Sequence, residues 1–328
     1  MQNLRILGKG KTALALKKRF PDAILYDDND LESFDKNSND LTIVSPGMPP
    51  HNKLVLASKN IISDYDLFYD EMPFTIWISG TNGKTTTTQM SQYLLEKFDS
   101  CYGGNIGVPL SGLNKDKKIW ILETSSFTLH YTKKAKPNIY ILLPITEDHI
   151  TWHGSFDEYK KAKLKPLELM NETDIAIIPA LYKDFKTSAH TIYYNSSDDL
   201  CNHFKIDKTK IKFNEPFLLD AIMAMVSRKI IFGDVDYDLI NSYKIDKHKV
   251  EEFRDSKNRL WIDDSKATNY DATINALVPY KDKNIHIIIG GDDKGASLQP
   301  LFENIKDLDI VIYAIGSNTQ RVLNYCEE

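Results

Sequence analysis

Short apolar runs alternate with amphipathic stretches along almost the whole chain. Several runs are continuously apolar or nearly so, for example 285–289, which is typical of strands buried on both faces of a parallel sheet. Between them lie helical patterns, and in 85–98 the apolar residues Met90, Leu94 and Phe98 fall on one face. The runs that we expect to form strands are 4–7, 24–26, 41–44, 74–79, 118–123, 138–142, 174–178, 260–263, 284–289 and 309–314. This alternation predicts an α/β protein with parallel sheets.

Two stretches interrupt the alternation and suggest domain boundaries. The segment 63–73 is acidic and aperiodic, and 234–249 is polar. A chain of 328 residues has room for two or three domains. The three that we expect are 1–63, 64–246 and 247–328.

The third of these domains, 247–328, is shorter than the ~100–150 residues of a typical domain. It contains three expected strands, and we expect no element after 309–314 to cover the sheet edge. We therefore expect this domain to be truncated and the chain to be incomplete as a catalyst.

Composition narrows the class of protein. Hydrophobic residues make up 42% and charged residues 27%, which excludes a disordered or fibrous chain. The net charge of −5 disfavours general binding of nucleic acid. The scattered cysteines Cys101, Cys201 and Cys326 do not form a disulfide framework, and no apolar run reaches the length of a membrane span. We expect a cytoplasmic monomer with no membrane partner.

A phosphate-binding loop is the clearest chemical signal. Gly80-Thr81-Asn82-Gly83-Lys84-Thr85-Thr86 follows an apolar strand and precedes an amphipathic helix. Backbone N–H groups of such a loop wrap a phosphate at a helix N-terminus, the lysine neutralises β/γ oxygens, and the hydroxyl of Thr85 can bind Mg²⁺. The two glycines are only three positions apart, so the loop is shorter than the usual P-loop. The segment still predicts an ATP site with Mg²⁺.

Acidic residues follow two further predicted strands. Glu123 ends the strand 118–123, and Thr146-Glu147-Asp148-His149 follows 138–142. Because ligands of open parallel sheets bind at the carboxyl ends of strands, these residues are candidates for metal binding or acid–base chemistry. Taken alone, Glu123 could equally be a solvated or helix-capping acid.

The N-terminal segment allows a different function. Gly8-Lys9-Gly10-Lys11-Thr12-Ala13 fits the pattern G-x-G-x-x-A after the first strand, and Asp27 ends the next strand. This is a dinucleotide fingerprint, so an NAD-dependent dehydrogenase is a real alternative. Against it, the segment of about 60 residues has room for one βαβ unit and a further strand only.

Five motifs in this order resemble the Mur ligase family. Besides the phosphate loop and Thr146-Glu147-Asp148-His149, they are Gly104-Asn105-Ile106-Gly107, Glu123-Thr124-Ser125-Ser126-Phe127 and Asp264-Ser265-Lys266-Ala267-Thr268-Asn269. The resemblance spans nearly the whole chain. It implies an ATP-dependent amide ligase of peptidoglycan precursor synthesis, with a Rossmann-like N-terminal domain, a P-loop central domain and a Rossmann-like C-terminal domain. Within the family, the chain most resembles members that add D-glutamate to UDP-N-acetylmuramoyl-L-alanine.

The resemblance also implies roles for matching positions. The residues implied to bind ATP are the loop Gly80–Thr86 together with Lys249 and Asp264. Those implied to bind the UDP substrate are Lys11, Thr12, Asp27, Asp28, Ser45, Pro46, Gly47 and Asn105. Those implied to meet D-glutamate are Lys266, Thr268 and Lys294. The catalytic residues would be Lys84, Glu123, His149 and Lys163, and the ligands of two Mg²⁺ ions would be Thr85, Glu123, His149 and Lys163.

Lys163 stands where the family carries a carbamylated lysine. Nothing in its local sequence suggests this, because Lys160-Lys161-Ala162-Lys163 is typical of a solvated helix face.

The chain departs from the family pattern at two positions. Asn214-Glu215-Pro216-Phe217 replaces a Gly-x-His-Asn string, so an adenine-side contact is missing or comes from elsewhere. Lys249 follows His248 where the family has an arginine, and an ammonium group cannot reproduce the bidentate contact of a guanidinium.

Other functions remain open at this point besides the dehydrogenase. A P-loop kinase or ATPase would need neither the third domain nor a UDP site. Another Mur-type ligase or a folylpolyglutamate-type ligase would share the loop, although the latter lacks such a leading nucleotide-sugar domain. A non-catalytic nucleotide-sugar binding protein would not need the metal-site acids.

Overall fold

The computed structural model describes residues 4–327, which fold into two compact units. The first unit contains residues up to 145 and 157–243, and the second contains 146–156 and 244 onward. The boundary that we place at residue 63 therefore lies within the first unit. Among residues 4–327, no helix combines the length and the hydrophobicity that crossing a bilayer requires.

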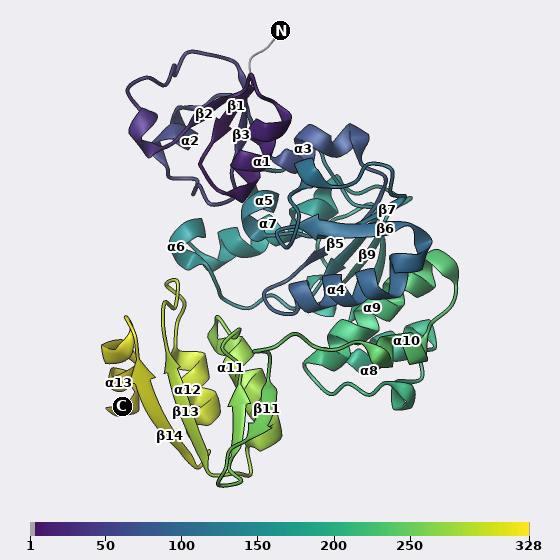
Figure 1. Cartoon of the computed structure of the whole chain (residues 1–328), viewed down its shortest axis with the longest axis vertical. Coiled ribbons are helices and arrows are strands. Elements are labelled where there is room, and N and C mark those ends of the chain that lie inside the picture. Colours follow the sequence, from purple (N-terminus) through teal and green to yellow (C-terminus); the bar gives the residue numbers. More distant parts are fainter. Residues whose placement is uncertain (1–3, 328) are drawn as a thin grey trace. The chain divides into compact units, whose positions relative to one another are not determined.

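A small parallel sheet opens the first unit. Its strands are β1 (Leu4–Leu7), β2 (Ile24–Tyr26), β3 (Leu41–Val44) and β4 (Ile61–Ile62), in the order β2-β1-β3-β4. Helix α1 (Lys11–Arg19) connects β1 to β2, and α2 (Lys53–Ala57) precedes β4 (Figure 1). The first crossover is the βαβ unit that the glycine pattern predicts.

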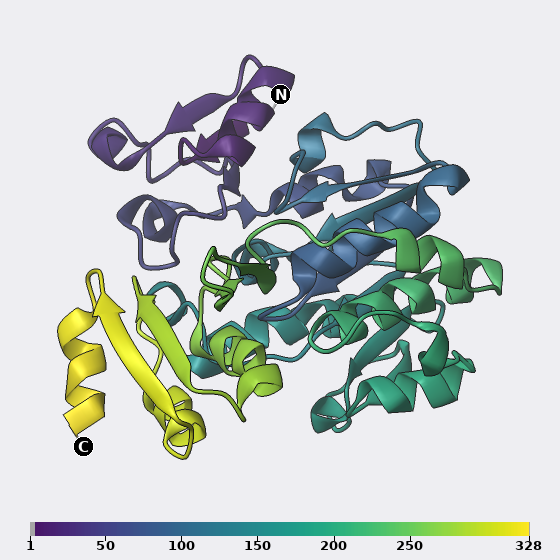
Figure 2. The same cartoon turned by 60° about the horizontal axis from the view of Figure 1, so that its bottom comes forward.

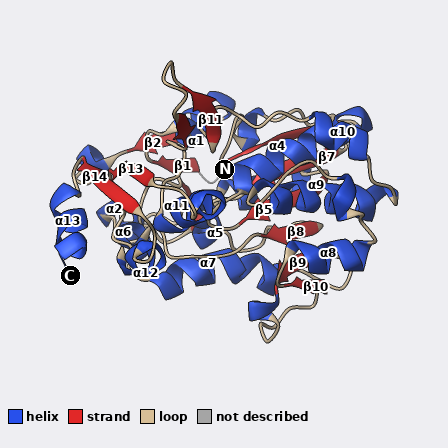
Figure 3. Ribbon diagram, turned by 90° about the horizontal axis from the view of Figure 1, so that it is seen from below, coloured by secondary structure: helices blue, strands red, loops and turns tan. Residues whose placement is uncertain are grey.

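The second sheet of this unit is larger and also parallel. Its strands are β5 (Phe74–Ser79), β6 (Ser100–Gly104), β7 (Ile119–Glu123), β8 (Ile139–Leu142), β9 (Ile175–Pro179) and β10 (His190–Tyr194). They lie in the order β10-β9-β8-β5-β7-β6, with helices on their connections (Figure 3). The adjacent strands β5, β7 and β8 are fully buried except at Phe74, as their apolar runs predict.

Helices accompany the larger sheet, some packed on it and others on neighbouring helices. They are α3 (Asp64–Phe68), α4 (Lys84–Leu95), α5 (Ser126–Tyr131), α7 (Phe156–Leu169), α8 (Ser197–Phe204), α9 (Phe217–Phe232) and α10 (Tyr237–Ser242). α4 packs against β5, β6 and β7 and against α9, which lies beside it (Figure 1). α9 is buried from Leu218 to Arg228 except at Leu219, because its sequence is apolar on nearly every face.

The second unit is a smaller α/β assembly, whose residues from 244 onward run from green to yellow in Figure 2; residues 146–156 also belong to it. Its strands are β11 (Glu251–Arg254), β12 (Leu260–Asp263), β13 (Ile285–Gly290) and β14 (Ile310–Ile315). Its helices are α6 (Ile150–His153), α11 (Tyr270–Leu277), α12 (Gln299–Ile305) and α13 (Thr319–Glu327). β11 and β12 form an antiparallel pair, and β13 and β14 form a parallel one.

Three expectations for this unit are wrong. β11 is a strand that its polar sequence did not indicate, and α13 follows the last strand, where we expected no further element. β13 is not buried on both faces: half-buried and exposed residues alternate, and Ile288 is 61% exposed. An apolar run does not distinguish a strand covered on both faces from one covered on a single face.

The expected α/β class with parallel sheets is confirmed.

Candidate active site

The phosphate loop occupies the turn between β5 and α4. Gly80 has a φ of 140°, and a Cβ atom there would lie 2.5 Å from Cβ of Leu143. Gly83 has a φ of 81°, and a Cβ atom there would lie 2.4 Å from Oδ1 of Asp220. Both positions therefore require glycine. Between them, the N–H of Thr81 donates to O of Pro144 at 3.0 Å, which holds the loop against the end of β8.

Lys84 and Thr85 begin helix α4, directly after this turn. The ammonium group of Lys84 donates to O of Thr81 at 2.6 Å, so it lies along the loop. The hydroxyl of Thr85 donates to Oε2 of Glu123 at 2.7 Å. The N–H groups of a first helical turn and an ammonium group suit the phosphates of a nucleotide.

Glu123 connects the loop to a second motif. It is 2% exposed at the end of β7, and its Oε1 accepts from Nδ2 of Asn105 at 2.6 Å. The backbone repeats the contact, because N of Asn105 donates to O of Glu123 at 2.9 Å. A carboxylate beside the Thr85 hydroxyl provides the oxygen ligands that Mg²⁺ prefers. Three residues that are distant in sequence thus meet at the carboxyl edge of the sheet.

Lys163 is buried next to the same loop, so its sequence-based assignment to a solvated helix face is wrong. It is 1% exposed, and its Nζ donates to O of Gly80 at 2.7 Å. Its neighbour Tyr159 is hydrogen-bonded through its hydroxyl to Oγ1 of Thr81 at 3.0 Å. Lys160 and Lys161 do face solvent, where they pair with acids of their own helix. A lysine amine is thereby placed beside the backbone of the phosphate loop.

A cavity of about 440 Å³ lies between the N-terminal sheet and the larger sheet of the first unit. Its walls include the turn 8–12, the turn 45–48 and the residues Gly104, Asn105 and Thr128. The predicted UDP-substrate residues that line it are Lys11, Thr12, Ser45, Pro46, Gly47 and Asn105. Asn105 belongs both to this cavity and to the Glu123 group.

Two predicted UDP-substrate residues do not line this cavity. Asp27 caps a short 3₁₀ turn by accepting from N of Asn29 at 2.9 Å, and it pairs with Lys9. The ion pair with Lys9 lowers the pKa of the Asp27 carboxyl. Asp28 accepts from Nδ2 of Asn52 at 2.7 Å. Both acids therefore have partners of their own on the N-terminal sheet.

The residues after β8 belong to the second unit. Asp148 is 4% exposed, and the ammonium group of Lys294 donates to its Oδ1 at 3.2 Å. N of His149 donates to the same oxygen at 2.8 Å, and Nδ2 of Asn269 to the other at 3.4 Å. Within this unit the structure thus brings the Asp148–His149 motif together with the predicted D-glutamate residue Lys294.

The remaining predicted residues of the second unit lie on two loops. Oδ1 of Asp264 accepts from N of Val250 at 3.1 Å, and burial raises the pKa of its carboxyl. Lys249 donates to Asp246 at 3.1 Å, while Lys266 and Thr268 are exposed after β12.

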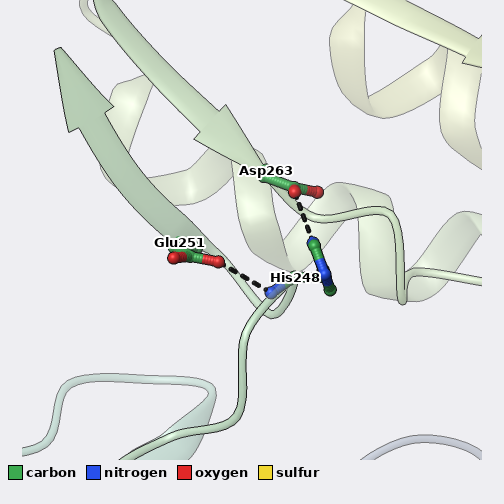
Figure 4. A group of neighbouring side chains, drawn as sticks. All are labelled: His248, Glu251 and Asp263. Carbon is green, nitrogen blue, oxygen red and sulfur yellow. Dashed lines mark hydrogen bonds and ion pairs between the residues drawn. The ribbon is translucent and has the colours of Figure 1, made fainter.

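A possible metal-binding group adjoins these loops (Figure 4). Among residues 4–327, ligand atoms of His248, Glu251 and Asp263 lie within 4.8 Å of one another. Nδ1 of His248 is 2.6 Å from Oδ2 of Asp263, and its N donates to Glu251 at 3.0 Å. These contacts already satisfy the three residues, and we assign no ion to them.

Sequence reasoning missed one residue of the phosphate loop's surroundings. Asp220, buried in the first turn of α9, accepts from Oγ1 of Thr87 at 2.7 Å and lies against Gly83. It lies a few positions after the altered string Asn214–Phe217, so extending that comparison by one helical turn would have found it.

Comparison with known proteins identifies the class. The model of the Mur ligase middle domain matches residues 78–215, and curated ligases match nearly the whole chain. The chain belongs to the Mur ligase family and is an ATP-dependent, amide-forming ligase. This confirms the expected family and favours it over the dehydrogenase and kinase alternatives.

Two curated relatives share the name UDP-N-acetylmuramoylalanine–D-glutamate ligase. The protein of Campylobacter jejuni (strain RM1221) is 50% identical over 343 residues, which cover 99% of this chain and 85% of the relative. That of Helicobacter pylori is 44% identical, covering 96% and 84%.

Solved structures share the fold at low sequence identity. The MurF ligase of Thermotoga maritima in complex with ADP has a TM-score of 0.61 at 16% identity, covering 97% of this chain and 82% of that one. MurC of the same organism has a TM-score of 0.55 at 13% identity, covering 100% and 88%. These likenesses support the fold alone.

Proposed function

We propose that this ligase joins D-glutamate to UDP-N-acetylmuramoyl-L-alanine in the synthesis of peptidoglycan precursors. The observation that carries the proposal is the 50% identity, over 99% of the chain, to a relative named for this reaction. The first unit supports it with a nucleotide loop and a separate cavity, which are connected because Asn105 lines the cavity and donates to Glu123, the acceptor of the Thr85 hydroxyl.

The reaction would have two steps. The L-alanine carboxylate attacks the γ-phosphorus of ATP, ADP leaves, and an acyl phosphate forms. The amine of D-glutamate then attacks the acyl carbon, loses a proton and displaces phosphate through a tetrahedral intermediate. Lys84 would neutralise charge on the transferring phosphoryl group, and the loop N–H groups would position it.

The residues of the first unit fit a magnesium ion. Thr85 and Glu123 would hold it through oxygen atoms, and Mg²⁺ bound there would neutralise charge on the ATP phosphates. For a second ion we propose a carbamylated Lys163 as a ligand, in keeping with the family resemblance. The Lys163 ammonium group would first lose a proton, and the neutral amine would then take up CO₂ and release a second proton, which leaves a carbamate anion in place of a cation.

The remaining substrate contacts follow the family resemblance. Lys11, Thr12 and the turn Ser45–Gly47 would bind the UDP part, with Asn105 at the diphosphate. Asp27 and Asp28 would lie toward the uridine. In the second unit, Asp264 and Lys249 would contact ATP, while Lys266, Thr268 and Lys294 would receive D-glutamate.

Phosphate release tests the proposal. Purified protein is supplied with ATP, Mg²⁺, UDP-N-acetylmuramoyl-L-alanine and one member of a panel of amino acids. We expect release to require the sugar nucleotide and to be fastest with D-glutamate. Release without the sugar nucleotide would contradict the ligase reaction, and a different preferred amino acid would contradict the substrate.

Lys84→Ala is the catalytic control for this assay. The variant should fold normally and lose turnover by far more than tenfold, because the charge at the β/γ oxygens is gone. Lys97→Ala, at an exposed position just after α4, should match the wild type.

A further inference from the structure

One acidic residue of the substrate cavity has no role in the function described above. Asp64 is the first residue of α3, it is 6% exposed, and it lines the 440 Å³ cavity beside Tyr65. Its carboxyl accepts hydrogen bonds from the backbone N–H groups of Asp64 and Tyr65. Among residues 4–327, no side chain pairs with it.

Local structure does not account for an acid at this position. Ser63 and Asp66 already cap α3 through a reciprocal capping box. Asp66 also accepts hydrogen bonds from the backbone N–H groups of residues 133–135, each at 2.8 Å. The buried Asp64 is destabilising by comparison, because desolvation raises the pKa of its carboxyl to about 7. A buried acid without a side-chain partner is expected where a ligand supplies the missing donor.

The cavity wall that carries Asp64 adjoins the Glu123 group, because the hydroxyl of the next residue, Tyr65, donates to O of Glu123 at 3.3 Å. The neighbouring Asn105 lines the same cavity and donates to Glu123, which accepts from Thr85 at the start of α4. The glycine turn 8–12, with Lys9 and Lys11, forms another part of the wall. A nucleotide sugar whose diphosphate lies on the glycine turn must extend its sugar toward the phosphate loop to reach ATP.

We propose that the Asp64 carboxylate accepts a hydrogen bond from a hydroxyl or amide N–H group in the sugar half of the nucleotide-sugar substrate; this rests on the function proposed above. The diphosphate is excluded as the partner of the carboxylate form, since both groups are then anionic. The sugar half carries hydroxyl and amide donors, which a carboxylate accepts strongly in a desolvated site. Asp64 thereby distinguishes the sugar nucleotide from UDP itself.

Calorimetric titration of the whole chain tests this assignment. UDP and UDP-N-acetylmuramoyl-L-alanine are titrated separately into wild type, Asp64→Ala and Asp64→Asn. We expect the full substrate to bind roughly tenfold or more weakly to Asp64→Ala, and UDP to bind within about twofold of wild type. Asp64→Asn should lie between, because its amide oxygen remains an acceptor.

Two controls separate binding from folding. Asp70→Asn, at an exposed acid shortly after α3, should bind both ligands as the wild type does. Titration with Mg·ATP should give the wild-type affinity for every variant, which shows that the phosphate loop is intact.

The outcomes that would overturn the inference are specific. Equal weakening of UDP and of the full substrate would assign Asp64 to the nucleotide half or to the fold. A wild type that does not bind UDP-N-acetylmuramoyl-L-alanine would overturn the proposed function as well. Tight binding of that substrate to wild type and both variants alike would overturn the role of Asp64 alone.

Discussion

At the scale of single residues, Lys163 shows how spacing can hide or reveal a site. Its neighbours Lys160 and Lys161 suggest a solvated face, but Lys163 lies four positions after Tyr159 and four before Leu167. Those two residues are buried on α7, so Lys163 lies on the buried stripe. The helical period therefore contained the signal, whereas the contact with Gly80 depends on tertiary packing that the sequence does not encode locally.

Replacement of Lys163 tests its role. Lys163→Ala should lose most ligase activity, and a short-chain carboxylic acid should restore part of it by supplying an anion in the vacated space. Phosphate release with and without added acid is the measurement. The matched control is Lys161→Ala, whose side chain is 73% exposed. Unchanged kinetics in Lys163→Ala would remove this residue from the mechanism.

Asp64 should make stability depend on pH. Its pKa is raised from 3.8 to about 7 in the folded chain, so folding binds a proton between these values. The unfolded state binds fewer protons there, and the free energy of unfolding falls as pH rises toward 7. In Asp64→Asn this fall in the free energy of unfolding is absent, because the amide does not titrate.

Between pH 5 and pH 8 the stability of the variant relative to the wild type should increase by roughly 2 kcal/mol. Urea denaturation at both pH values measures the difference. Asp70→Asn, which changes an exposed acid, should show no such divergence. A constant difference between Asp64→Asn and wild type would mean that the Asp64 carboxyl titrates normally.

At the scale of elements, the sequence predicted the buried strands best. β5, β7 and β8 follow from continuous apolar runs, but β6 does not, because Gly103 and Gly104 are poor strand formers. β10 has an exposed Tyr193 at the sheet edge, and this also weakens its pattern. The strand order depends on crossovers, which no local pattern specifies.

The turn between β5 and α4 should tolerate no side chain. Gly80→Ala should lower the free energy of unfolding by roughly 2–3 kcal/mol, because φ is unsuited to alanine and the Cβ atom would overlap Leu143. Mg·ATP binding should weaken strongly as the loop shifts. Chemical denaturation and calorimetry measure the two effects.

Gly233→Ala supplies the comparison for this change. Gly233 ends α9 with a φ of 81° and no atom within 4 Å of a built Cβ. Gly233→Ala should lower the free energy of unfolding by about 1 kcal/mol, which is the cost of the backbone conformation alone, and it should bind Mg·ATP with normal affinity. An equal decrease in the free energy of unfolding in both glycine variants would mean that overlap with Leu143 does not contribute to the effect of Gly80→Ala.

At the scale of the molecule, the sequence predicted three domains in chain order, while the structure has two compact units. Local signals mark where the chain is polar or aperiodic, but they do not show which segments pack together. The substrate cavity and the phosphate loop share the first unit because Asn105 and Glu123 connect them. That connection joins residues of two separate motifs, and their local sequences do not show that the two side chains meet.

Asn105 should therefore affect both substrates. Asn105→Ala removes the donor to Glu123, so Mg·ATP affinity should fall by roughly tenfold, along with affinity for the sugar nucleotide. Separate titrations with the two ligands measure this. Asn304→Ala, at an exposed position on α12, should change neither. If Asn105→Ala weakened only the binding of the sugar nucleotide, Asn105 would have a role in the cavity and none in Mg·ATP binding.

The route of residues 146–156 has a topological consequence. This segment leaves the first unit after β8, belongs to the second unit, and returns in α7. Within the second unit, Glu147 accepts from N of Ser297, and N of Thr151 donates to O of Lys294. A nick between residues 243 and 244 would therefore not yield two self-contained pieces. The amino-terminal fragment would keep residues 146–156, which the carboxyl-terminal fragment needs for its own fold.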